Sequence, residues 1–235
     1  MKAKKSKKKE EQKSAFESSE VLAEQISKTE EFLVKYKTPV SIILGALVVA
    51  VSSVFIYRYI NNNKNETAKT DMIQAVYYFE SDSLDLALNG DGNNLGFLDI
   101  IDEFGTTETG NLANFYAGSI YLKSGNFNRA ISYLNEFSTN DILIQARAYS
   151  LVGDAYMELA NYDNAADYYT NAADYNPNKY FTPTYLLKAA LAYEKLSDLK
   201  KAKEMYQKIV DDFYDSNQVQ KAKKHLARLE VLLSS

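Results

Sequence analysis

The chain has 235 residues with no cysteine, no tryptophan and one histidine, and 46% of the residues are hydrophobic. The lack of cysteine excludes disulfides, thiol nucleophiles and zinc sites built from cysteine and histidine. Residues 1–60 carry 11 Lys/Arg against 7 Asp/Glu, whereas residues 61–235 carry 16 against 24. This division argues against nucleic-acid binding by an acidic folded domain and confines any polyanion contact to the N-terminal end.

The N-terminal end is predicted to be a lysine-rich cytosolic tail at residues 1–15, beginning KAKKSKKK after the initial methionine. We expect a solvated topogenic signal, because like charges without large apolar residues cannot form a core. Contact with anionic lipid or ribosomal RNA is compatible with this interpretation. An amphipathic helix is predicted next, at residues 16–37, and it lies on the bilayer surface or packs against a partner.

The strongest signal is the apolar stretch within residues 38–60. From Pro39 to Tyr57 there is no charge for 19 residues, and such a helix spans about 28 Å, close to the ~30 Å hydrocarbon core of a bilayer. We therefore predict one transmembrane helix. A cleaved signal peptide is the alternative, disfavoured because the stretch is longer than a usual signal core and follows a long tail. Small side chains that would permit close contact with another transmembrane helix are Gly45, Ser52 and Ser53.

The distribution of lysine and arginine predicts the orientation of this helix. Ten of these residues precede the span, and only Arg58, Lys64 and Lys69 follow it closely. Because positive charge favours the cytoplasmic side, the tail is expected inside and the folded domain outside. In a bacterium the chain would then be a single-pass inner (cytoplasmic) membrane protein with a cytoplasmic N-terminus and a periplasmic domain.

After a polar linker at residues 61–67, helical patterns separated by Gly, Asn and Asp turns continue to the C-terminus, so the domain is predicted to be all-α. One pattern recurs three times: a small residue, a tyrosine three positions later, an alanine nine further on, and a large apolar residue after four more. Its spacing predicts antiparallel helix pairs that approach closely at the small residue and the alanine. The three sets are Gly118, Tyr121, Ala130 and Leu134; Gly153, Tyr156, Ala165 and Tyr169; and Ala190, Tyr193, Ala202 and Tyr206.

This pattern resembles the tetratricopeptide repeat over residues 112–214, although the tryptophan of that family is missing. Residues 111–235 are therefore expected to form a solenoid of such repeats with a C-terminal capping helix. Residues 68–110 are expected to be a degenerate helical pair, since Ala75 and Tyr78 echo the first helix and Ala87 the second. The predicted fold class is all-α, with one N-terminal transmembrane helix before the solenoid.

The resemblance implies a protein-binding concave face, lined by the first helix of each repeat. Its apolar and charged mixture lacks the repeated Lys and Asn positions of similar domains that hold a C-terminal carboxylate. The residues expected on this face are Phe115, Ser119, Leu122, Arg147, Ser150, Asp154, Met157, Leu187, Leu191 and Glu194.

No catalytic, cofactor or metal site is predicted. The usual motifs for nucleotide, phosphate or hydrolytic chemistry are missing, and His225 lies beside lysines without catalytic partners, which indicates a structural or surface residue. The loop from Asp91 to Glu103 places Asp91, Asn93, Gly96 and Asp102 near calcium-loop offsets, but Leu95 occupies a ligand position. An ordinary turn is the preferred interpretation, and an enzyme is the least favoured class.

The whole architecture from about Glu31 onward resembles the YfgM family, an ancillary subunit of the bacterial SecYEG translocon. That resemblance implies SecYEG and a periplasmic isomerase such as PpiD as partners, and a role in passing newly exported chains to chaperones. A second hypothesis is an envelope assembly or cell-division scaffold with one fixed partner. An import receptor on an organelle is a third, disfavoured by the lysine-rich tail.

Overall fold

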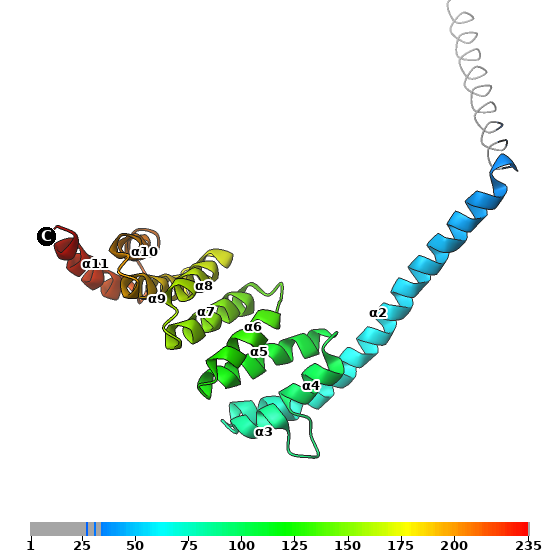
Figure 1. Cartoon of the computed structure of the whole chain (residues 1–235), viewed down its shortest axis with the longest axis horizontal. Helices are drawn as coiled ribbons and strands as arrows, with labels where there is room; N and C mark the ends of the chain where they lie inside the picture. The colour runs from blue at the N-terminus through cyan, green and yellow to red at the C-terminus, as the bar shows by residue number, and fades with distance from the viewer. Residues whose placement is uncertain (1–26, 28–30, 32–33, 235) are drawn as a thin grey trace, which may run out of the picture. The chain divides into compact units, whose positions relative to one another are not determined.

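The computed structural model describes residues 27, 31 and 34–234 of the chain (Figure 1). The chain divides into two compact units, residues 1–60 and residues 61–235. The predicted lysine-rich tail at residues 1–15 and most of the predicted amphipathic helix at residues 16–37 lie outside the described residues. Across the described part, every regular element is an α-helix, which confirms the predicted all-α fold class.

The first unit contains the beginning of helix α2, which runs from Lys37 to Glu80. Within the described residues, α2 is the one helix that is long and apolar enough to cross a membrane, with a mean hydropathy of 2.5 in its most apolar window. None of that window is buried by the residues that the structure describes, and large side chains such as Ile42 and Phe55 are 65% and 68% exposed. An exposed apolar helix of this length is unfavourable in water and is typical of a segment that lies in a membrane or against another protein.

The structure differs from the sequence prediction at residues 61–67, where a polar linker was expected and α2 continues as helix. The segment contains no glycine or proline to end the helix. Its asparagines also have partners in the second unit: Asn65 Oδ1 accepts from the backbone N–H and the hydroxyl of Thr109 at 3.0 and 2.9 Å. Asn61 donates from Nδ2 to the backbone carbonyl of Thr106 at 3.2 Å, and its Oδ1 accepts from the Thr106 hydroxyl at 3.0 Å. These polar residues therefore fix the helix against its neighbours.

The second unit is a stack of helices in which each one from α4 to α11 packs against the next along the chain (Figure 1). Antiparallel pairs form from α5 with α6, α7 with α8, and α9 with α10, and α11 closes the end. This is the predicted order of three pairs and a cap. The helices are α3 (Leu84–Asn89), α4 (Phe97–Phe104), α5 (Glu108–Lys123), α6 (Phe127–Glu136), α7 (Ile142–Glu158), α8 (Tyr162–Tyr175), α9 (Thr182–Lys195), α10 (Leu199–Asp212) and α11 (Val219–Ser234).

The two helices of each pair touch where the sequence pattern places its small residues. A Cβ atom added to Gly118 would lie 2.6 Å from Cγ of Leu134, and one added to Gly153 would lie 2.7 Å from Cδ1 of Tyr169. In the third pair Ala190 and Tyr206 are fully buried. The small residue therefore makes room for the large apolar residue of the partner helix, as the spacing predicts.

The turn inside each pair has the same geometry four times. Asp82, Gly125, Ala160 and Ser197 all have positive φ, between 55° and 74°. In each turn the next residue donates its N–H to the carbonyl of the pattern's tyrosine, at 2.8 to 2.9 Å. This is the arrangement that closes a helix with a left-handed residue after its last turn. The fourth example, between α2 and α3, shows that the degenerate pair begins as a repeat does.

The second half of that pair departs from the repeat. Ala87 is fully buried, as its place in the pattern predicts, but α3 ends after six residues. A loop and the separate helix α4 follow, and α4 buries Phe97, Ile100 and Phe104 against the core. The second helix of this pair is therefore split into two short helices.

Candidate protein-binding face

Two hollows on the first helices of the repeats bring together most of the residues predicted for the concave face. The first, of about 550 Å³, is lined by Leu122, Asp154, Met157 and Leu191 among others. The second, of about 450 Å³, is lined by Arg147, Ser150 and Asp154 among others. Asp154 and Lys188 line both hollows, so one ion pair lies where the two hollows adjoin.

That ion pair is held in place from several sides. Lys188 Nζ lies 2.8 Å from both carboxylate oxygens of Asp154 and 3.2 Å from the hydroxyl of Ser150. The hydroxyl of Tyr169 donates to Asp154 at 2.6 Å, and the ammonium lies 5.4 Å from the centre of the Tyr169 ring. The two charged side chains are 33% and 30% exposed. A ligand therefore meets a polar contact point that is already ordered.

Tyr169 acts in this group as a neutral donor. Burial raises the pKa of its hydroxyl, and the charge of Asp154 and the hydrogen bond to it raise that pKa further. The proton consequently stays on Tyr169 throughout the physiological pH range. The Asp154 carboxylate therefore accepts hydrogen bonds from both the Tyr169 hydroxyl and the Lys188 ammonium.

The sequence prediction missed Lys188 and Tyr169 as members of this face. A signal for Lys188 was present, because it stands two residues before the small residue of its repeat. The same position holds Tyr116 in α5 and Leu151 in α7. A charge where sister repeats carry an apolar residue indicates a local function or a specific partner. Tyr169 was identified only as a packing residue.

Several predicted residues contribute little exposed surface to this face. Ser119, Ser150 and Leu187 are buried, at 9%, 3% and 5% exposure, and the Ser119 hydroxyl is bonded to the carbonyl of Phe115. The ring of Phe115 packs on Phe137 with centroids 5.3 Å apart. A helix inside the stack has neighbours on both sides. More of its surface is therefore buried than its pattern of apolar and polar residues predicts.

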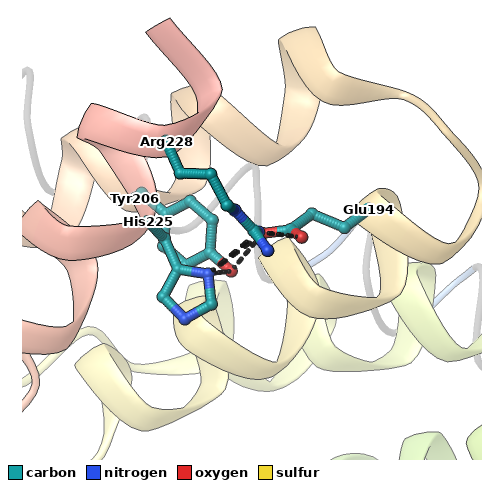
Figure 2. Close-up of polar contacts among 4 residues, drawn as sticks. All are labelled: Glu194, Tyr206, His225 and Arg228. Atoms are coloured by element: carbon teal, nitrogen blue, oxygen red, sulfur yellow. Dashed lines mark hydrogen bonds and ion pairs between the residues drawn. The ribbon is translucent and has the colours of Figure 1, made fainter. Parts of the chain in front are cut away.

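Glu194 is the clearest case of a predicted contact residue with another task (Figure 2). Its Oε1 accepts from the hydroxyl of Tyr206 at 2.8 Å and lies 3.2 Å from Nδ1 of His225. Its Oε2 pairs with the guanidinium of Arg228, and the rings of Tyr206 and His225 stack at 4.8 Å. These four residues, which we call the cap cluster, join α9, α10 and α11. The interpretation of His225 as a structural residue fits this position.

The loop weighed as a calcium site is closed by its own hydrogen bonds. Asp91 Oδ1 accepts from the backbone N–H groups of Asn93 and Asn94 at 2.8 and 2.7 Å, and Oδ2 accepts from the Tyr78 hydroxyl at 2.7 Å. The hydrogen bond from Tyr78 and those from Asn94 and Asn93 lower the pKa of Asp91 far below its ordinary value. Among the described residues no group of three or more His, Cys, Asp or Glu side chains gathers as for a metal. Residues 91–96 therefore form a loop held by hydrogen bonds to Asp91, and Asp102 lies in α4.

The small residues proposed for contact within the membrane lie on the uncovered part of α2. Apart from its own turn of α2, a Cβ atom added to Gly45 would meet no atom of the described chain within 4 Å. The hydroxyl of Ser53 is bonded to the carbonyl of Val49 at 2.8 Å, which satisfies it within its own helix. Ser52 is exposed like its neighbours. These positions are free for another helix, and their use remains a prediction.

Comparison with known proteins supports the repeat assignment. The tetratricopeptide-repeat families match residues 113–139, 146–179 and 184–216. A curated relative, "Uncharacterized protein ycf37" of Guillardia theta, is 33% identical over 102 residues, which are 41% of this chain and 56% of the relative. The chain thus spans about half the length of that relative. It is an all-α protein in which a long apolar helix precedes the repeats in the sequence. Its residues 113–216 form tetratricopeptide repeats, a protein–protein interaction module.

Proposed function

We propose that this chain is a membrane-anchored adaptor at the Sec translocon. In this proposal the apolar part of α2 crosses the inner membrane with the lysine-rich tail in the cytoplasm, and the repeats lie in the periplasm. There the concave face binds newly exported chains and a chaperone or isomerase such as PpiD. The observation that carries the proposal is an uncovered apolar helix in the same chain as a repeat face with two open hollows.

The chemistry of the face suits polypeptide as the ligand. The first hollow offers Leu122, Met157 and Leu191, and its aliphatic and thioether side chains adapt to varied apolar partners. The second offers Leu143 and Phe181, which are 48% and 47% exposed. Two apolar hollows on either side of a polar point fit an unfolded segment with alternating apolar and polar side chains better than a small molecule.

The preformed ion pair supports a second candidate, an envelope assembly or cell-division scaffold with one fixed partner. Asp154, Lys188 and Tyr169 hold one another in one geometry. A fixed polar contact favours a ligand with a matching polar group at one position, because a mismatched ligand would leave a desolvated charge unpaired. This selectivity suits a single partner more than a range of exported chains.

Site-specific photocrosslinking in native membranes separates the two functions. Probes belong at Gly45 in the apolar helix and at Arg147 and Met157 on the repeat face, with Asp167 on the outer helix α8 as the control. Translocon subunits at Gly45 together with varied exported chains at Met157 are the expected result. One envelope protein at both face positions and no translocon subunit would replace the adaptor by the scaffold.

A further inference from the structure

A third hollow lies outside the face predicted from the sequence, between the last turns of α2 and the first turns of α5. We call it the α2/α5 groove. It measures about 600 Å³, and its α2 wall precedes the residues that match tetratricopeptide repeats. Both walls belong to the second unit. The apolar residues that line the groove are Met72, Ile73, Val76, Tyr77, Leu112 and Tyr116.

The groove combines a firm floor with open apolar walls. The ring of Tyr116 stacks on Phe97 at 4.9 Å and meets the edge of Phe79 at 5.1 Å, so packing fixes the floor before any ligand arrives. By contrast Ile73 and Tyr77, one helical turn apart on α2, are 67% and 62% exposed. A pair of large apolar side chains beside an apolar hollow is typical of an interaction surface.

The charged residues that line the groove are two acidic ones and one basic one, Lys69, which is also paired with Glu66 at 2.8 Å. Residues 66–108, which include most of the lining, contain 10 Asp/Glu and one Lys/Arg. Glu80 and Glu108 line the groove itself and are exposed. An acidic rim attracts a cationic partner and repels an anionic one.

We propose that the α2/α5 groove binds a basic amphipathic helix of a partner protein. The groove runs along two helices, so a third helix can lie in it with apolar side chains at intervals of three and four residues against Ile73, Tyr77 and Leu112. Lysine or arginine on the flanks of that helix then faces Glu80 and Glu108. This inference rests on the proposed function, since it names the kind of segment that the N-terminal end of the repeat domain accepts.

The test uses the full chain in phosphatidylcholine nanodiscs and a fluorescein-labelled 16-residue helix of leucine and lysine. A leucine and glutamate helix of the same pattern is the matched peptide, and empty nanodiscs correct for binding to lipid. Fluorescence anisotropy is expected to show saturable binding of the lysine peptide and none of the glutamate peptide. The double variant Ile73→Ser/Tyr77→Ser is expected to weaken binding at least ~10-fold, since large apolar anchors carry most of such an interface.

Two further variants make the result specific. Tyr214→Ser removes a tyrosine that is more exposed than Tyr77, at 77%, and lies between α10 and α11; it is expected to leave the affinity unchanged. Glu80→Gln/Glu108→Gln is expected to weaken binding and to reduce its dependence on salt, because two of the attracting charges are gone.

Three results would overturn the proposal: equal binding of the two peptides, binding that survives Ile73→Ser/Tyr77→Ser, or self-association of the chain that this double variant abolishes. The last result would assign the groove to a second copy, whose α11 carries four Lys/Arg against one glutamate. Crosslinks from Gly45 to the translocon do not involve the groove. Their presence without peptide binding would remove this inference and leave the proposed function standing.

Discussion

At the scale of single residues, the cap cluster shows how one partly buried carboxylate joins three helices. Burial would raise the pKa of Glu194, but hydrogen bonds from Tyr206 and Arg228 and the charge of Arg228 outweigh it, so the pKa lies below its ordinary value. Burial, and then the same hydrogen bond, raise the pKa of Tyr206, which keeps its proton as a donor. The ionised form of Glu194 is therefore the one that holds α11 in place.

A lowered pKa makes this contribution dependent on pH. Because Glu194 binds its proton more weakly in the folded state, its stabilising effect is complete above the unfolded pKa of about 4.5. It declines as the pH falls below that value toward the folded pKa. Chemical denaturation of the full chain between pH 7 and pH 3.5 is expected to show a smaller loss for Glu194→Gln than for the wild type.

At pH 7 the same variant is expected to be less stable than the wild type by about 1–3 kcal/mol, because it weakens the bonds to Tyr206 and Arg228 at a partly buried site. Glu204→Gln, an exposed carboxylate on α10, is the control and should follow the wild type at every pH. Parallel curves for wild type and Glu194→Gln would show that the carboxylate does not act as described.

At the scale of helices, the turn with positive φ is the feature that all four helix pairs share, although their helices differ in length. Gly125 adopts this conformation without a side chain to obstruct it, whereas Ala160 and Ser197 adopt it with a Cβ atom. A left-handed backbone costs ordinary residues about 1 kcal/mol or more. The stack tolerates this cost because the turn also provides the hydrogen bond to the tyrosine carbonyl.

The turns predict a stabilising substitution. Ala160→Gly removes a Cβ atom from a left-handed position and is expected to raise the free energy of unfolding by about 0.5–1 kcal/mol. Gly125→Ala is expected to lower it by about 1 kcal/mol for the opposite reason. The matched control is Ala227→Gly at an exposed position inside α11, where the same exchange should destabilise by about 1 kcal/mol.

Thermal or chemical denaturation of the full chain measures these differences. The sign is decisive: if Ala160→Gly destabilises as Ala227→Gly does, the residue is not strained in the folded protein.

At the scale of the whole molecule, the uncovered apolar segment is expected in a membrane, whereas the acidic repeat domain is expected in water. The apolar window of α2 has no cover within the described chain, whereas the second unit has a core of its own built from the stacked helices. We expect the full chain to remain in the membrane pellet after carbonate extraction. Residues 61–235 alone are expected in the soluble fraction.

A full-length variant with Val48→Asp and Val51→Asp tests whether membrane insertion, rather than the presence of residues 1–60, retains the chain in the pellet. A charge near the centre of a span costs about 2.5–3.5 kcal/mol. This variant should be extracted by carbonate. A wild-type chain recovered in soluble form with its first 50 or so residues removed would instead support the cleaved signal peptide.

Much of this architecture follows from local pattern. The uncharged stretch after Pro39 and the three sets beginning at Gly118, Gly153 and Ala190 depend on hydrophobicity and on residue size at fixed spacing. Both properties are visible in a sequence because each helix contributes them by itself. The all-α class, the order of the repeats and the capping helix are therefore determined by the sequence alone.

Which residues of the candidate binding face stay open was decided only by the tertiary structure. Leu187 and Glu194 have the spacing of surface residues, yet one is buried by neighbouring helices and the other pairs with α10 and α11. Lys188 reaches Asp154 from the next repeat, and the α2/α5 groove joins residues about 40 positions apart. Which side chains remain open depends on how helices from different repeats cover one another, and that is a property of the packed stack rather than of any single segment.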